Sequence, residues 1–369
     1  MNKFLYILLF LSAIFVSVMV YKLSGVEHVS PNSLPSGANL NDVRTAVVTE
    51  IRQELDYQEN AGMSGVVHLQ WGDTVLIHEA YGWQDREAEQ AMTVEVGFDI
   101  GSIVKLMTAA TVLKLAENGR LPTADTIGQF FPDAPSTIRA IALDQLLVHT
   151  SGLPEYLGDD YELLNHEAAL DRIFAARLRF APGTREAYSN TGYTLLALVI
   201  EVASGLPYEQ AVREAVLIPA GTPSIGYRLA DWAQDDLAVG YRDQQRWGKP
   251  LDHAWLDDGP SWTLRGNGGM LATADDLARW FEAVFTGKIL GREALSRFLD
   301  LFGISPDDYG LRIGEAGGND IFNVLYEGWI DLGVNLTFLT SVSSHSAEQV
   351  WNEIRDEVYK LAQAAAIES

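Results

Sequence analysis

The stretch VGFDIGSIVKLMTAATVLKLAENGRL (residues 96–121) predicts the end of a strand, a short turn and then a helix. Gly119 is typical of a residue that ends a helix. Lys105 lies one turn inside this helix, among apolar neighbours, so its charge needs a chemical reason. The apolar residues that recur at helical spacing are Ile103, Leu106, Met107, Ala110 and Leu113.

Strand patterns lie near both ends of the chain, on either side of this stretch. Residues 64–82 (SGVVHLQWGDTVLIHEAYG) predict a hairpin that turns at Gly72-Asp73. Residues 319–327 (NDIFNVLYE) and 334–342 (VNLTFLTSV) predict two more strands. Amphipathic patterns predict a helix before the hairpin, at 41–57, and another after the last strand, at 345–363.

The part of the chain between these strands is mainly helical. Helical patterns occur at 140–149, 166–177, 192–203, 207–216 and 275–286. A tryptophan-rich part at 222–265 interrupts them, and we expect it to pack against the site or to cover it.

The sequence therefore predicts an α+β fold, in which one antiparallel sheet is built from both chain ends and is flanked by helices. Two strands alone are only marginally stable, so the two ends must meet. We expect the sheet subdomain at about 41–100 and 305–366, a helical subdomain inserted at about 101–304, and one domain over 41–366.

Composition excludes several classes of function. The chain of 369 residues has a formal net charge of -24, which argues against binding to nucleic acid. It contains no cysteine, so disulfides, thiolate nucleophiles and cysteine-type zinc sites are excluded. The seven histidines do not pair at metal-ligand spacing, and we expect neither a metal nor a cofactor.

The N-terminus predicts a membrane segment. Lys3 is followed by an uncharged and mostly apolar run, residues 4–21, and then by Lys22. That run is long enough to cross a bilayer and no Ala-x-Ala cleavage site follows, so a retained anchor is favoured over a cleaved signal peptide. Residues 23–40 are rich in Ser, Pro, Gly and Asn and predict a linker. We expect the domain to be exported across a bacterial inner membrane.

Ser102 and Lys105 are three residues apart, and in a helix such residues share a face. A lysine in apolar surroundings loses part of its preference for the charged form and can take the proton of a serine hydroxyl. The backbone N–H of Ser102, at a helix N-terminus, supplies half of an oxyanion hole. By itself the pair also fits a helix cap and a snorkelling lysine.

Tyr188-Ser189-Asn190 stand just before an apolar helix and add to this pair. The Tyr188 phenol can relay protons, and the Asn190 amide can hold the lysine and a substrate carbonyl. The alternatives are a core tyrosine and a capping asparagine.

Four further stretches occur in the same order as in a known family: 113–133 (LKLAENGRLPTADTIGQFFPD), 146–154 (LLVHTSGLP), 181–201 (APGTREAYSNTGYTLLALVIE) and 268–280 (GGMLATADDLARW). With the Ser-x-x-Lys and Tyr-x-Asn motifs, the chain resembles the serine β-lactamase and penicillin-binding-protein family. The class C-like branch, with class C β-lactamases, D,D-peptidases and related serine esterases, is the most similar. The resemblance covers about residues 42–345.

The third motif of the family is different in this chain. The resemblance implies Lys or His, any residue, then Gly on the strand that lines the far side of the cleft. The matching positions here are Glu315, Ala316 and Gly317, followed by Gly318, whose N–H is the expected second oxyanion donor. In relatives the cation helps to bind a substrate carboxylate, and Glu315 would repel that group.

Three explanations of Glu315 stay open, besides the structural alternative that the motif aligns some residues away and Glu315 is a solvated residue at a strand start. Arg312 can reach in and supply the positive charge; the substrate can lack a carboxylate or carry a positive charge; or the site can be inactive.

The sequence thus predicts a serine hydrolase with Ser102 as nucleophile, Lys105 and Tyr188 as the proton-transfer groups, and Asn190, Glu315, Gly317, Gly318 and Arg312 on the substrate side. Esters or peptides are expected as substrates in preference to β-lactams. The alternative is a catalytically weak module of the cell envelope that keeps the fold and binds peptidoglycan fragments or a protein. A salt bridge between Glu315 and Lys105 would favour that alternative, because it would hold the lysine protonated.

Overall fold

The computed structural model describes residues 39–242, 244–253 and 255–368. The predicted anchor, residues 4–21, lies outside these ranges, and so does nearly all of the predicted linker. Among the described residues, no single helix combines the length and apolar composition needed to span a membrane. One pair bent by 76°, Asn190–Ser204 with Tyr208–Ala220, reaches that length and composition together.

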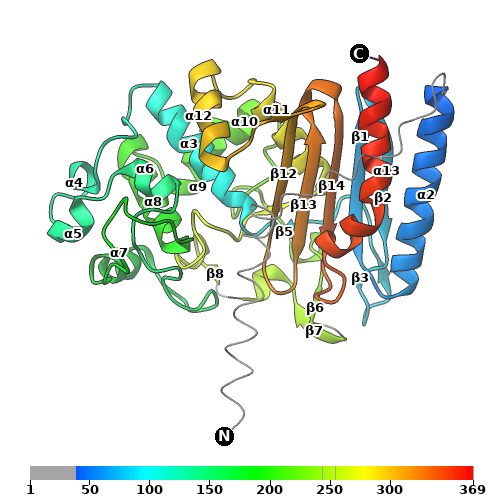
Figure 1. Cartoon of the computed structure of the whole chain (residues 1–369). Coiled ribbons are helices and arrows are strands. Elements are labelled where there is room, and N and C mark those ends of the chain that lie inside the picture. The colour runs from blue at the N-terminus through cyan, green and yellow to red at the C-terminus, as the bar shows by residue number, and fades with distance from the viewer. Residues whose placement is uncertain (1–38, 243, 254, 369) are drawn as a thin grey trace, which may run out of the picture.

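A six-stranded antiparallel sheet unites the two ends of the chain (Figure 1). Its strand order is β11-β12-β13-β14-β1-β2, so the last strand pairs with the first, as predicted. Gly65 pairs with Thr340 at one end of that ladder. The strands are β1 (Gly65–Trp71), β2 (Thr74–Tyr81), β11 (Pro306–Asp307), β12 (Gly310–Gly318), β13 (Asn323–Trp329) and β14 (Val334–Thr340).

The first and last helices cover one face of this sheet (Figure 1). They are α2 (Leu40–Asn60) and α13 (Ala347–Glu368). Ile51 and Leu55 of α2 and Ile354 and Val358 of α13 are buried in one apolar cluster with residues of the sheet. Both predicted amphipathic helices therefore exist, and α2, capped by Asn39, begins one residue before the predicted range 41–57.

The helical block lies on the opposite face of the sheet (Figure 1). Its central helix, α3 (Ile103–Glu117), is buried on nearly all sides, as expected for a helix at the centre of a domain. The other helices of the block are α4 (Ile127–Phe130), α5 (Ser136–Arg139), α6 (Leu143–Leu147), α7 (His166–Phe174), α8 (Asn190–Ser204), α9 (Tyr208–Val212), α10 (Ile218–Ala220), α11 (Ala274–Phe285) and α12 (Arg292–Phe302). A π-helical turn, Arg213–Leu217, joins α9 to α10.

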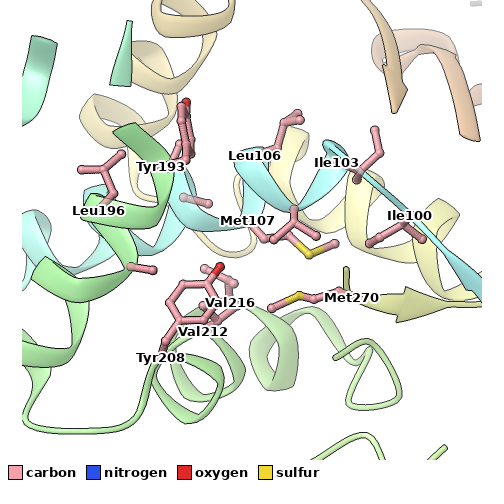
Figure 2. Close-up of a cluster of buried hydrophobic side chains, with 14 of the residues drawn as sticks. Ile100, Ile103, Leu106, Met107, Tyr193, Leu196, Tyr208, Val212, Val216 and Met270 are labelled. Atoms are coloured by element: carbon pink, nitrogen blue, oxygen red, sulfur yellow. The ribbon is translucent and has the colours of Figure 1, made fainter. Parts of the chain in front are cut away.

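Packing around the start of α3 holds that helix in place. Figure 2 shows Ile103 and Met107 of α3 in one buried cluster with Ile100, Met270 and Tyr208. These side chains come from segments far apart in the sequence. The N-terminus of α3 is therefore fixed by the apolar core.

Short ladders complete the fold. The pair of β5 (Phe98–Asp99) with β10 (Leu271–Ala272) leads directly to the start of α3. The others are β3 (Trp83–Asp85) with β4 (Gln90–Ala91), β6 (Gly240–Arg242) with β7 (Gln245–Gly248), and β8 (Trp255–Leu256) with β9 (Gly259–Pro260). The 3-10 turns are Gln234–Asp236, Pro250–Asp252 and Ile330–Leu332.

The tryptophan-rich part, 222–265, mostly packs against other rings. Trp262 is buried in the core, and Trp247 stacks on His253 with 3.8 Å between the ring centroids. Trp247 also lies near Tyr161. The expected structural packing of these rings is therefore present.

Candidate active site

Ser102 lies at the N-terminal end of α3, after a turn that only glycine fits well. Gly101 has a φ of +49°, in the left-handed region. A Cβ atom on Gly101 would lie 2.3 Å from the backbone nitrogen of Gly318. The turn thus brings the residue before Ser102 into direct backbone contact with the end of β12.

The side chains of Lys105 and Tyr188, which the motifs single out together with Ser102, both lie within hydrogen-bond distance of the Ser102 hydroxyl. Ser102 Oγ lies 2.9 Å from Lys105 Nζ and 2.8 Å from the phenol oxygen of Tyr188. Lys105 comes from the next turn of α3, and Tyr188 from the segment just before α8. Ser102 Oγ, the predicted nucleophile, is therefore within hydrogen-bond reach of two groups that can transfer protons.

Burial shifts the ionisation of Lys105. The side chain is 4% exposed, and its ammonium donates to the backbone carbonyl of Asn267 over 2.7 Å as well as to Ser102. Burial lowers the pKa of Lys105 from 10.5 to about 7, and the negative charge of Asp160 acts in the opposite direction. A substantial fraction of Lys105 is therefore neutral at pH 7 and able to accept a proton.

Tyr188 is shifted in the opposite sense. Burial raises the pKa of this phenol well above its usual value, so Tyr188 is protonated at neutral pH. Its ring lies 4.6 Å from the ring of His149, centroid to centroid. His149 Nδ1 accepts the backbone N–H of Ser189 over 3.1 Å, which fixes the chain next to Tyr188.

The residues after Tyr188 divide two roles between them. The cap of α8 is Ser189, whose hydroxyl accepts the N–H of Gly192, so Asn190 is not the capping residue. Among the residues that the structure describes, Asn190 Oδ1 is buried without a hydrogen-bond partner. The carbonyl that holds Lys105 belongs to Asn267 and not to Asn190. Asn190, two residues after Tyr188, thus carries a hydrogen-bond acceptor that the described residues leave unused.

The third-motif strand, β12, lies against the start of α3. A Cβ atom on Gly317 would lie 2.8 Å from the backbone nitrogen of Ile103 and 2.9 Å from the backbone oxygen of Ile100. Gly317 therefore allows the strand and the helix N-terminus to touch. Gly318 N lies close to Gly101, the residue before Ser102, and is the expected second oxyanion donor.

Glu315 projects from the same face of the sheet as the active site. It lies directly opposite Tyr326 in the β12–β13 ladder, so the two side chains share a face. Tyr326 stacks on Phe281 of α11 with 3.9 Å between ring centroids, which identifies this as the face under the helical block. Together with burial and Tyr188, the charge of Glu315 raises the pKa of Tyr193, beside the active site.

Arg312 does not enter the site, and that explanation of Glu315 is wrong. It lies opposite Trp329 on the other face of the sheet. Its Nε donates to Glu327 over 2.6 Å, and its guanidinium lies 5.2 Å from the ring centroid of Tyr359 on α13. An odd number of positions separates Arg312 from Glu315, and alternate residues of a strand point to opposite faces.

The sequence motifs missed several groups around Ser102. Asp160 and Asn267 act on Lys105, His149 packs on Tyr188, and Asp99 binds the backbone before Ser102. His149 belongs to the family stretch 146–154, which was a usable signal. Asn267 contributes only a carbonyl, and no residue type marks that role. In the described ranges, no group of three or more His, Asp or Glu residues could hold a metal ion.

Comparisons with known proteins agree with this geometry. The Beta-lactamase family model matches residues 50–311. Penicillin-binding protein 4* of Bacillus subtilis (strain 168) is 30% identical over 194 residues, which is 50% of this chain and 43% of that protein. The putative penicillin-binding protein PbpX of the same strain is 26% identical over 313 residues, 83% of this chain and 77% of that protein. The match therefore spans less than half the length of the first relative.

A solved structure has the same architecture. The D-amino acid amidase from Ochrobactrum anthropi SV3, in complex with L-phenylalanine amide, superposes with a TM-score of 0.66 and 22% identity. The match covers 86% of this chain and 98% of that one. The predicted α+β fold, with a sheet from both chain ends and an inserted helical block, is thus confirmed.

Proposed function

Because this chain belongs to the β-lactamase family of serine hydrolases, as its motifs predicted, we propose that it cleaves esters or amides through an acyl-enzyme on Ser102. One observation carries the proposal: Ser102 Oγ lies between Lys105 Nζ, at 2.9 Å, and the Tyr188 phenol, at 2.8 Å. A nucleophile with two proton-transfer groups in reach is the minimum equipment for acyl transfer.

In acylation, Lys105 is the base. Neutral Lys105 takes the proton of Ser102 as Oγ attacks the substrate carbonyl, and the N–H groups of Ser102 and Gly318 stabilise the oxyanion. Tyr188, protonated at neutral pH, donates its proton to the leaving oxygen or nitrogen as that bond breaks. The Lys105 ammonium then returns a proton to the Tyr188 phenolate through a water molecule, because Ser102 Oγ is now an ester oxygen that carries no proton.

In deacylation, a water molecule attacks the ester formed on Ser102. The same groups take one proton from water and give one back to Ser102 Oγ, so the enzyme is regenerated. The side chain of Asn190, partly buried two residues after Tyr188, is the group that we expect to position the acyl part of the substrate.

Glu315 favours substrates without a carboxylate near the scissile bond. Its charge stands where relatives have a cation, and Arg312 faces away and cannot compensate. A β-lactam or a D-alanyl terminus would bring a second negative charge to this strand. An ester or an amine-bearing amide would not, and the amidase of similar fold was solved with such an amide.

The protonation state of Lys105 supports a hydrolase in preference to a binding module. The carboxylate whose charge acts on Lys105 is Asp160, and burial outweighs it, so the lysine is not held protonated near neutral pH.

Intact-protein mass spectrometry tests the proposal. The full chain, purified in detergent, is incubated with a fluorophosphonate and separately with a penicillin, alongside Ser102→Ala and the matched control Ser136→Ala, an exposed serine. We expect fluorophosphonate adducts on the parent and the control but not on Ser102→Ala, and a much slower penicillin adduct. Folded parent protein that forms no adduct with either reagent would contradict the hydrolase reading.

We further propose that residues 4–21 anchor the chain in a bacterial inner membrane, with the domain on the outer side. The apolar run between Lys3 and Lys22 supports this. The test is protease treatment of spheroplasts: the domain should be degraded while a cytoplasmic marker survives, and deletion of residues 1–22 should leave the domain protected inside the cell.

A further inference from the structure

Asp99 is a buried carboxylate three residues before the nucleophile, and the mechanism above does not use it. Its Oδ1 accepts the backbone N–H of Gly101 over 2.8 Å, and its Oδ2 accepts Nδ2 of Asn319 over 3.3 Å. The backbone N–H of Gly269 also stabilises its charge. Burying a carboxylate is costly, so its donors need to be close and well directed.

Each of these donors belongs to a different wall of the active site. Gly101 precedes Ser102, and Asn319 directly follows Gly318 on the third-motif strand. Gly269 lies two residues after Asn267, whose carbonyl holds Lys105. A single carboxylate therefore joins the segments that carry both oxyanion donors and the lysine acceptor.

We propose that Asp99 is a positioning residue that, through Asn319, sets the distance between the two oxyanion N–H groups, those of Ser102 and Gly318. The inference rests on the proposed acyl-enzyme function. Preorganised donors stabilise an oxyanion only when they are held close to its eventual position, so a small displacement of β12 from α3 slows acylation.

The orientation of Asn319 makes this contact specific. Its Oδ1 accepts the N–H groups of Ile321, at 2.8 Å, and Phe322, at 2.9 Å, within the turn that joins β12 to β13. The amide cannot rotate by 180° without losing both bonds, so only Nδ2 faces Asp99. The partner of Asn319 must therefore be an acceptor.

Two single substitutions break the pair with little change of shape. Asp99→Asn can satisfy Gly101 but then sets one NH2 group against another at Asn319. Asn319→Asp keeps the turn acceptor but sets two carboxylates against each other. For both, with a p-nitrophenyl ester at pH 8, we expect kcat to fall about 100-fold, the scale of losing one oxyanion donor. KM should stay within about twofold, because ground-state binding does not use the oxyanion hole.

The double variant Asp99→Asn with Asn319→Asp distinguishes positioning from general stability. It exchanges donor and acceptor and restores a hydrogen bond between the two side chains. We expect kcat to return to within about tenfold of the parent, because interacting residues do not behave additively. Thermal melting curves verify that all variants are folded. If the loss of kcat in the double variant equals the product of the losses in the two single variants, the proposal is overturned.

Controls separate the possible failures. Asp276→Asn removes another buried carboxylate, on α11, and should lower the melting temperature without changing kcat. If Asp99→Asn does not fold, Asn319→Ser takes its place, because the serine hydroxyl can cap the turn but is too short to reach Asp99. A kcat equal to that of the parent in Asn319→Ser overturns the proposal. A parent that forms no acyl-enzyme would refute the proposed function, whereas an active parent with equally active single variants would refute only the role of Asp99.

Discussion

At the residue scale, burial gives Lys105 the property that its proposed role as a base requires. The side chain is surrounded by the apolar core of the helical block, and that environment lowers its pKa to about 7. The same burial raises the pKa of Tyr188. These opposite shifts in two neighbouring groups support the proposed roles of Lys105 as base and Tyr188 as acid.

The pH dependence of acylation should follow Lys105. Only the neutral amine accepts a proton, so kcat/KM should rise with pH and level off above about 7. Asp160→Asn removes a charge that favours the ammonium, which lowers the pKa of Lys105 further and moves the acid limb to lower pH. Stopped-flow ester hydrolysis from pH 5 to 9 measures this. The control is Asp133→Asn, because Asp133 is exposed and is not among the charges that act on Lys105. If the acid limb of the Asp160→Asn variant stays in place or moves to higher pH, the assignment of Lys105 as the base is contradicted.

Glu315 should control the choice between esters and β-lactams. Glu315→Lys replaces repulsion of a substrate carboxylate by attraction and should speed penicillin acylation at least about tenfold, which corresponds to about 1.4 kcal/mol. Glu315→Gln removes only the repulsion, so its rate of penicillin acylation should lie between those of the parent and the Glu315→Lys variant. The rate of penicillin adduct formation, followed by mass spectrometry, is the measurement. Parental rates in both variants would show that Glu315 does not set this preference.

At the scale of elements, the contact between β12 and the N-terminus of α3 is made by backbone atoms. Gly101→Ala would push a Cβ atom against Gly318 N and should slow ester acylation at least about tenfold through the displaced oxyanion donor. Gly119→Ala is a matched control, because Gly119 also has a positive φ but its Cβ would meet nothing within 4 Å. Gly119→Ala should lose about 1–2 kcal/mol of stability from its positive φ alone, and Gly101→Ala should lose more, because its Cβ also meets backbone atoms. Equal acylation rates in the two variants would argue against the contact.

Periodicity predicted the long elements well and the faces of isolated strands poorly. The hairpin of β1 and β2 and the helices α2, α8, α11 and α13 were each indicated by residues that fill one face. The region 140–149 forms only the short helix α6, and α12 was not predicted. Arg312 was proposed as one of three explanations of Glu315, a cation that can reach into the site, but it lies on the other face of the sheet. The face to which a strand residue points depends on register with a partner, and a single strand does not reveal that register.

The site itself was predictable where one helical turn or one short motif determines it. Ser102 and Lys105 meet because three residues make nearly one turn, and Tyr188 comes from a family motif. Asp160 and Asn267 come from loops whose position depends on the whole helical block, so sequence spacing carried no signal for them.

At the scale of the whole molecule, the strands from the two ends of the chain form one sheet, which includes β12 with the third motif. Ile354→Ala in α13 leaves a cavity beneath that sheet and should lower the free energy of unfolding by about 2–5 kcal/mol. Urea titration, read by tryptophan fluorescence and by fluorophosphonate labelling, is the measurement, and the two midpoints should fall together. The exposed neighbour Glu353→Ala should leave both unchanged. A labelling midpoint that stays parental would mean that the active site does not depend on this part of the core.

The pairing of β1 with β14 also constrains the order of folding. Gly65 emerges early in synthesis, but its partner Thr340 is made close to the end. The first hairpin must therefore wait with one edge open while the rest of the chain appears, and such high contact order slows folding and leaves the edge open to aggregation. For a chain that is made vectorially, a chaperone that shields this waiting hairpin would raise the yield, and moving the natural termini by circular permutation so that β14 precedes β1 would shorten the wait.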